Sequence, residues 1–114
     1  ETIMESTTLL IANHHAWAND WKRTKIENLA MLFEGAIIAR EKIGLKMNVS
    51  KGALNQVLEK LPALRKPTIS TLSEDAGYAI ETVVDETIAR KIIPELKRAG
   101  AEGIIEYPLN KVIL

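Results

Sequence analysis

The chain has 114 residues, 46% of them hydrophobic, which suffices for one compact domain and not for two well-buried ones. Fifteen basic and fifteen acidic residues cancel, so the charge does not favour nucleic acid, an anionic membrane or an acidic substrate as a partner. The absence of cysteine excludes a disulfide framework and a thiolate metal site, and no apolar run approaches the roughly 20 residues of a membrane span. We therefore expect a cytoplasmic protein. Because the sequence begins Glu-Thr-Ile without an initiator methionine, we also expect it to be a segment of a longer chain.

The first part of the chain predicts a short strand and a long helix. Residues 5–12 are rich in strand-favouring residues, and Asn13 follows as a helix N-cap or turn residue. From about Trp21 to Lys42, apolar residues recur at the spacing of an amphipathic helix, which Gly44 would end. Such a helix would be about 30 Å long and could connect two domains.

From Gly44 onward the pattern predicts alternating strands and helices. The elements are a strand at 45–49, a helix between Ser50 and Pro62, strands at 67–72 and 77–84 that form a hairpin, a helix between Asp85 and Gly100, and a strand at 103–107. This order is typical of an α+β, ferredoxin-like βαββαβ domain, with an antiparallel four-stranded sheet and two helices on one face. Pro94 would kink the second helix, and Pro108 would end the last strand.

Few residues in the chain could carry out catalysis. The sequence contains no glycine-rich phosphate loop, nucleophile elbow or zinc-protease motif. His14 and His15 are adjacent, with Asp20 nearby, but neighbouring residues on a helix point about 100° apart and rarely share one ion. We therefore predict no metal site and no catalytic residue in this segment. The acidic residues that could be considered as acid and base pairs are interpreted as solvated surface charge: Glu81, Glu86, Glu95 and Glu106.

An RNA-binding sheet is also not favoured. Such a sheet needs aromatic and basic residues on its open face, and the predicted strands offer only Tyr78 and Tyr107 in a chain of zero net charge.

The segment 61–73 allows two interpretations. Pro62 and Pro67 restrict the backbone, and the hydroxyl residues that follow suit a small zwitterion because they both donate and accept hydrogen bonds. Proline is equally a common helix stop, and threonine a common strand residue. From the residues alone the second interpretation is favoured.

A series of short blocks in a fixed order identifies a resemblance. They are Leu-Ile-Ala-Asn at 10–13, Asp-Trp-Lys at 20–22, Lys-Ile-Glu at 25–27, Leu-Lys-Met-Asn-Val at 45–49, Leu-Pro-Ala-Leu at 61–64, Pro-Thr-Ile-Ser at 67–70, Glu-Thr-Val-Val-Asp at 81–85 and Gly-Ala-Glu-Gly-Ile at 100–104. Together they resemble the C-terminal part of long-form ATP phosphoribosyltransferase, the first enzyme of histidine biosynthesis, over essentially the whole chain.

The resemblance implies a division of the chain and a function. Residues 1–20 would be the tail of the catalytic region, 21–43 a connecting helix, and 44–114 a ferredoxin-like regulatory domain. This domain would bind free L-histidine, for allosteric feedback inhibition, at contacts between subunits of a homo-oligomer, from dimer to hexamer. The intact enzyme would join ATP and phosphoribosyl pyrophosphate, with Mg²⁺, to give phosphoribosyl-ATP and pyrophosphate. The phosphate loop and the Mg²⁺ would lie outside this segment, which would be inert alone.

The resemblance also implies the residues that contact histidine. They are Asn48, Leu64, Thr68, Val83 and Gly103, with Ser70 and Ser73 as further candidates. Asn48 and Thr68 would supply hydrogen bonds, Leu64 and Val83 an apolar wall, and Gly103 room for close approach of the backbone. Where this chain has Asn48, some relatives have an acidic residue or a histidine, so a charge-assisted contact would be missing here. The alternative function is a non-catalytic ferredoxin-like oligomerisation module that binds no amino acid.

Overall fold

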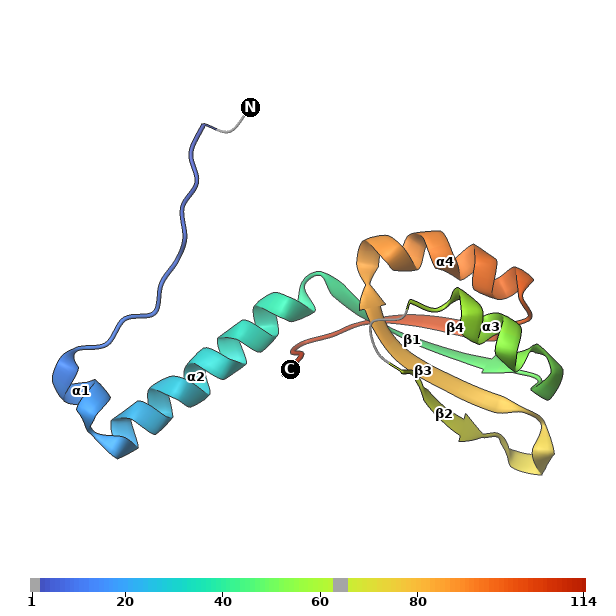
Figure 1. The fold of residues 1–114 in the computed structure, drawn as a ribbon, viewed down its shortest axis with the longest axis horizontal. Helices are drawn as coiled ribbons and strands as arrows, with labels where there is room; N and C mark the ends of the chain where they lie inside the picture. The colour runs from blue at the N-terminus through green and yellow to red at the C-terminus, as the bar shows by residue number, and fades with distance from the viewer. Residues whose placement is uncertain (1–2, 63–65) are drawn as a thin grey trace.

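The structure of the protein is a computed structural model, which describes residues 3–62 and 66–114. Two helices precede a small domain of strands and helices (Figure 1), and the molecule measures 60 × 43 × 20 Å. The elements in order are α1 (His14–Ala18), α2 (Asp20–Ala39), β1 (Lys42–Val49), η1 (Lys51–Ala53), α3 (Leu54–Lys60), β2 (Thr68–Thr71), η2 (Ser73–Asp75), β3 (Tyr78–Asp85), α4 (Glu86–Arg98) and β4 (Glu102–Pro108).

The four strands form one antiparallel sheet in the order β2-β3-β1-β4. Helix α3 lies between β1 and β2 in the chain, and α4 lies between β3 and β4. The predicted ferredoxin-like arrangement is therefore confirmed. No helix in the described residues is both long and apolar enough to cross a membrane.

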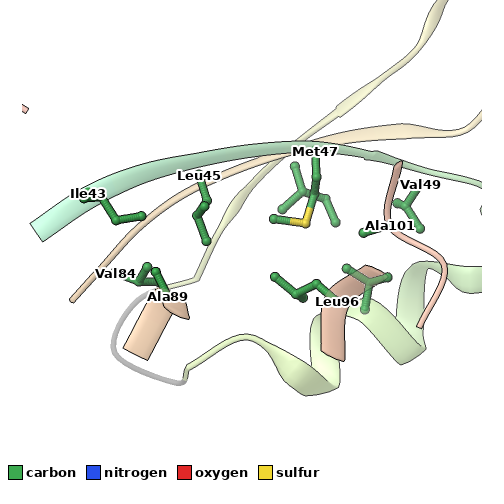
Figure 2. Close-up of a cluster of buried hydrophobic side chains, with 10 residues drawn as sticks. Ile43, Leu45, Met47, Val49, Val84, Ala89, Leu96 and Ala101 are labelled. Carbon is green, nitrogen blue, oxygen red and sulfur yellow. The ribbon is translucent and has the colours of Figure 1, made fainter. Parts of the chain in front are cut away.

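The core lies between the sheet and helices α3 and α4. Alternate residues of β1 point toward the helices and are buried (Figure 2): Ile43, Leu45, Met47 and Val49. They meet Ile80 and Val84 of β3, Val57 of α3, and Ala89 and Leu96 of α4. Because the side chains of a strand alternate between its two faces, the intervening residues of β1 lie on the opposite face of the sheet. We call this face, away from α3 and α4, the open face.

The long helix ends earlier than predicted. It spans Asp20–Ala39, whereas we expected a connecting helix over 21–43 that Gly44 would stop. Lys42 is already the first residue of β1, where it pairs with Asp85 of β3, and Ile43 is buried in the core. Pairing and burial of these residues outweigh their ability to continue a helix.

The strand predicted at residues 5–12 is wrong. Residues 3–13 form no helix or strand, although their composition favours extended backbone. A strand needs a neighbouring strand to pair its N–H and C=O groups, and none of the four described strands pairs with residues 5–12. Composition alone does not supply that partner.

The predicted helix caps are confirmed only in part. Asn13 caps α1, since its Oδ1 accepts a hydrogen bond from the Ala16 N–H at 2.8 Å. Ser50 and Asp85 precede their helices but make no side-chain capping bond. The carboxylate of Asp85 instead accepts a hydrogen bond from Lys42 Nζ at 2.7 Å, so it joins two strands.

Candidate functional site

The open face of the sheet gathers residues from all four strands. The cross-strand register and the alternation of side chains assign to it Lys42, Gly44, Lys46 and Asn48 of β1, Thr68 and Ser70 of β2, Ala79, Glu81, Val83 and Asp85 of β3, and Ile105 and Tyr107 of β4. Tyr78 lies on the other face and packs against the core. The open face therefore has Tyr107 as its aromatic residue, and it does not support the RNA-binding interpretation.

Two of the predicted histidine contacts line one hollow of about 550 Å³ on this face. They are Thr68 and Val83, both of which are exposed. Thr68 lies opposite Glu81 in the β2–β3 register. Glu81 and Val83 are two residues apart on β3. The volume lies within the range of about 300–1,000 Å³ usual for small-molecule sites.

The other predicted contacts lie elsewhere. Asn48 lies on the open face but outside the hollow, and its partner on β4 is Glu102. Gly103 follows Glu102 and has a φ of +55°. Ser70 faces Ala79, in the same cross-strand row as Asn48. Ser73 lies in the 3₁₀ turn η2 and not on the sheet. Leu64 lies outside the described residues.

The predicted contacts therefore form two groups. Val83 lies opposite Gly44, and Asn48 lies four residues further along β1. This separation is about 13 Å, because a strand advances about 3.3 Å per residue. Thr68 lies nearer to Asn48, because it shares the cross-strand row of Lys46, two residues from Asn48 on β1.

The centre of the open face holds a hydrogen-bonded cluster of Tyr107, Glu81 and Lys46. The Tyr107 hydroxyl donates to Glu81 Oε1 at 2.7 Å, and Lys46 Nζ lies 3.7 Å from the same oxygen. Lys46 Nζ also lies 5.7 Å from the centre of the Tyr107 ring. The hydrogen bond to Glu81, then burial and the charge of Glu81, raise the pKa of Tyr107 above its usual value.

Gly44 makes this cluster possible. The Tyr107 ring lies across Gly44, so a Cβ atom at residue 44 would overlap the ring. Tyr107 on β4 thereby crosses the central strand β1 and reaches Glu81 on β3. Glycine inside a strand weakens it and marks a place where another group approaches closely.

Residues after β4 form a wall of the same hollow. Val112 and Leu114 line it together with Lys66. The backbone N–H of Val112 donates to the carbonyl of Gly35 in α2 at 2.9 Å, and the side chain of Ile113 lies against Gly35. The hollow therefore lies between the sheet and a segment attached to α2.

Comparison with known protein families identifies the chain. The family described as HisG, C-terminal domain, matches residues 39–111. The chain belongs to this family. The match begins at the end of α2 and covers the whole ferredoxin-like sheet with its two helices.

Curated relatives agree with the HisG C-terminal assignment. The chain is 61% identical to the ATP phosphoribosyltransferase of Chlorobaculum parvum and 58% identical to that of Chlorobium luteolum, in both cases over 99% of the chain. It is 54% identical to the ATP phosphoribosyltransferase of Solibacter usitatus over its full length. The chain spans 38% to 39% of the length of these relatives.

The described side chains of the chain form no group of metal ligands. His14 and His15 lie in α1 and are exposed. Within residues 3–62 and 66–114, no group of three or more His, Cys, Asp or Glu side chains could hold a metal ion. No role proposed below for these residues depends on a metal.

Sequence reasoning missed the Gly44–Tyr107–Glu81 arrangement in this domain. It interpreted Gly44 as a helix stop, Tyr107 as a candidate for base stacking, and Glu81 as a solvated charge. One signal was available, namely a glycine at the start of an alternating strand. The sequence did not indicate which aromatic residue would lie over it, because that depends on the β1–β4 register.

Proposed function

We propose that this chain is the C-terminal regulatory part of an ATP phosphoribosyltransferase, and that it binds free L-histidine for feedback inhibition. The observation that carries the proposal is the 61% identity, over 99% of the chain, to an enzyme of that name. The hollow on the open face supports the binding role, because a residue pair implied by the resemblance, Thr68 and Val83, lines it together.

The intact enzyme would join ATP and phosphoribosyl pyrophosphate to give phosphoribosyl-ATP and pyrophosphate. We propose that the catalytic residues, and the Mg²⁺ that the resemblance implies, belong to the part of the enzyme that this chain does not span. A cytoplasmic location is likewise part of the proposal.

Histidine would bind between copies of the chain. The support for this step is that Thr68 and Val83 line the hollow, whereas Asn48 and Gly103 lie outside it. If Thr68 and Val83 of one copy faced Asn48 and Gly103 of another, both groups could reach one ligand. The homo-oligomer, up to a hexamer, would then be required to complete the site.

Inhibition requires a difference in affinity between two states of the enzyme. A ligand that binds both states equally shifts nothing, so histidine must bind more tightly to a less active arrangement of the subunits. A site assembled from two copies satisfies this requirement, because its shape depends on how the copies are arranged.

Calorimetric titration of the full-length protein with L-histidine, against other amino acids, tests the proposal. We expect saturable heat with L-histidine at millimolar concentration or below, and a higher melting temperature in its presence. No heat and no thermal shift in an assembled sample would favour the second candidate function, an oligomerisation module without an amino-acid ligand. That candidate is supported by large apolar side chains that α2 exposes, which include Trp21, Leu29, Phe33 and Ile37.

A further inference from the structure

The hollow on the open face carries charges of both signs. Lys66 and Glu81 line it together with Thr68. Lys42 also lines it but is bonded to Asp85 at 2.7 Å. A hollow with a cation and a carboxylate suits a zwitterion better than a simple anion or a simple cation, because each end of the ligand meets an opposite charge.

We propose that Glu81 binds the α-ammonium group of the amino-acid ligand, and that Tyr107, seated over Gly44, is the positioning residue that holds Glu81 for this contact. The proposal rests on the proposed histidine-binding function and adds to it the residue that selects an amino acid over a simple carboxylate.

The position of Glu81 matches this role. Thr68 lies directly opposite Glu81 across β2 and β3, and opposite residues in an antiparallel pair have Cβ atoms about 5 Å apart. A group that is hydrogen-bonded to the Thr68 hydroxyl therefore lies within reach of the Glu81 carboxylate. The side chain of Glu81 is 50% exposed, so a ligand from solvent can approach it.

The contacts of Glu81 within the protein leave it able to bind a ligand. Tyr107 and Lys46 both approach one oxygen, Oε1. A carboxylate has a second oxygen with its own lone pairs, which can accept from an ammonium group. The 2.7 Å bond from Tyr107 restrains the side chain of Glu81 before the ligand arrives, which lowers the entropy lost on binding.

A purely structural role for Glu81 leads to a different expectation. Its ion pair with Lys46 spans 3.7 Å between half-exposed side chains, a class that contributes little to stability. If that pair were its whole role, removal of the charge would not change which ligands bind. The test therefore measures discrimination between ligands and not only affinity.

The experiment compares two probes by calorimetry on the full-length assembled protein. The probes are L-histidine and 3-(imidazol-4-yl)propionate, which is the same molecule without its ammonium group. For the wild type we expect histidine to bind at least about tenfold more tightly, because a charge-assisted hydrogen bond is lost with the propionate. We compare the ratio of the affinity for histidine to the affinity for the propionate. In Glu81→Gln, which keeps the shape of the side chain and removes its charge, this ratio should fall about tenfold, through weaker histidine binding alone.

Two further variants make the result specific. Tyr107→Phe keeps the ring over Gly44 and removes the hydroxyl, so the ratio should fall by a smaller factor, about threefold, although Glu81 is unchanged. Glu106→Gln also removes a carboxylate charge. Glu106 precedes Tyr107 on β4 and lies on the other face of the sheet, outside the hollow. The ratio of Glu106→Gln should equal that of the wild type.

The outcomes separate the two proposals. If the wild type binds histidine and Glu81→Gln keeps the wild-type ratio, the role of Glu81 is wrong and the histidine-binding function stands. If the wild type binds neither probe, the proposed function fails and the role of Glu81 fails with it. If Glu81→Gln does not fold, Tyr107→Phe decides, since an unchanged ratio in that variant contradicts the positioning role.

Discussion

At the scale of single residues, Thr68 is the predicted contact whose position the sheet defines best. It begins β2, faces Glu81, and lines the hollow with Val83. The resemblance named this residue, whereas the pattern of prolines and hydroxyls alone favoured an ordinary turn and strand. The physical reason is that a threonine in a strand looks the same in sequence whether its hydroxyl meets a ligand or water.

The variant Thr68→Val should weaken L-histidine binding about two- to tenfold, because it removes one net hydrogen bond at nearly constant volume. The fold should be kept, since Thr68 is exposed and valine favours strands. Calorimetry on the full-length protein measures the change. Thr71→Val is the matched control, because Thr71 lies on the same strand, opposite Tyr78, on the other face of the sheet. Equal affinities in the two variants would remove Thr68 from the site.

At the scale of elements, the order of strands and helices from β1 to β4 followed from sequence, and the boundaries near Gly44 did not. The strand at 45–49 and the helices between Ser50 and Pro62 and between Asp85 and Gly100 were predicted from local signals, and the structure has β1, α3 and α4 there. The start of β1 at Lys42 depends on pairing with β3, and the role of Gly44 depends on Tyr107 of β4. Such contacts between distant parts of the chain leave no local pattern.

The Tyr107 side chain of β4 lies over Gly44 of β1 and bonds Glu81 of β3, so it contacts three strands. This arrangement predicts the effect of Gly44→Ala. The added methyl group would overlap the Tyr107 ring, so the ring must move and its hydrogen bond to Glu81 is lost. We expect the free energy of unfolding to fall by about 1–3 kcal/mol, as for other overpacked sites, and histidine binding to weaken. Urea unfolding measures the first effect and calorimetry the second.

Gly52→Ala provides the control for this change. A Cβ atom at Gly52 meets no other atom within 4 Å, so the free energy of unfolding should change by no more than about 0.5 kcal/mol. If Gly44→Ala is as stable as Gly52→Ala and binds histidine normally, the crossing of Tyr107 over β1 has no part in stability or binding.

At the scale of the whole molecule, the hollow on the open face is lined by Thr68 and Val83 but not by Asn48 or Gly103. The resemblance implied these contacts without their spacing in the fold, which depends on the pairing of the strands. Whether two copies bring these groups together depends on an assembly that a single sequence does not encode in any local pattern. Helix α2 also exposes several large apolar residues, a feature typical of surfaces that contact another chain or segment.

A site shared between copies predicts that histidine strengthens assembly. A ligand that binds the assembled form and not the separate subunits shifts the equilibrium toward the assembly by mass action. Sedimentation velocity of the full-length protein at several concentrations, with and without L-histidine, measures this shift. We expect larger species at the same protein concentration when histidine is present. Saturable histidine binding by a sample that remains monomeric would contradict the shared site.

The contact between Val112 and Gly35 has a mechanical consequence. The sheet is joined to α2 through the turn at residues 40–41, and the chain after β4 contacts α2 through this 2.9 Å hydrogen bond. Val112 lies four residues beyond the end of β4, so this bond holds the C-terminal segment, and not the sheet itself, against α2. Because Val112 and Leu114 line the hollow, release of Val112 from Gly35 would free one wall of the hollow while the sheet stays intact.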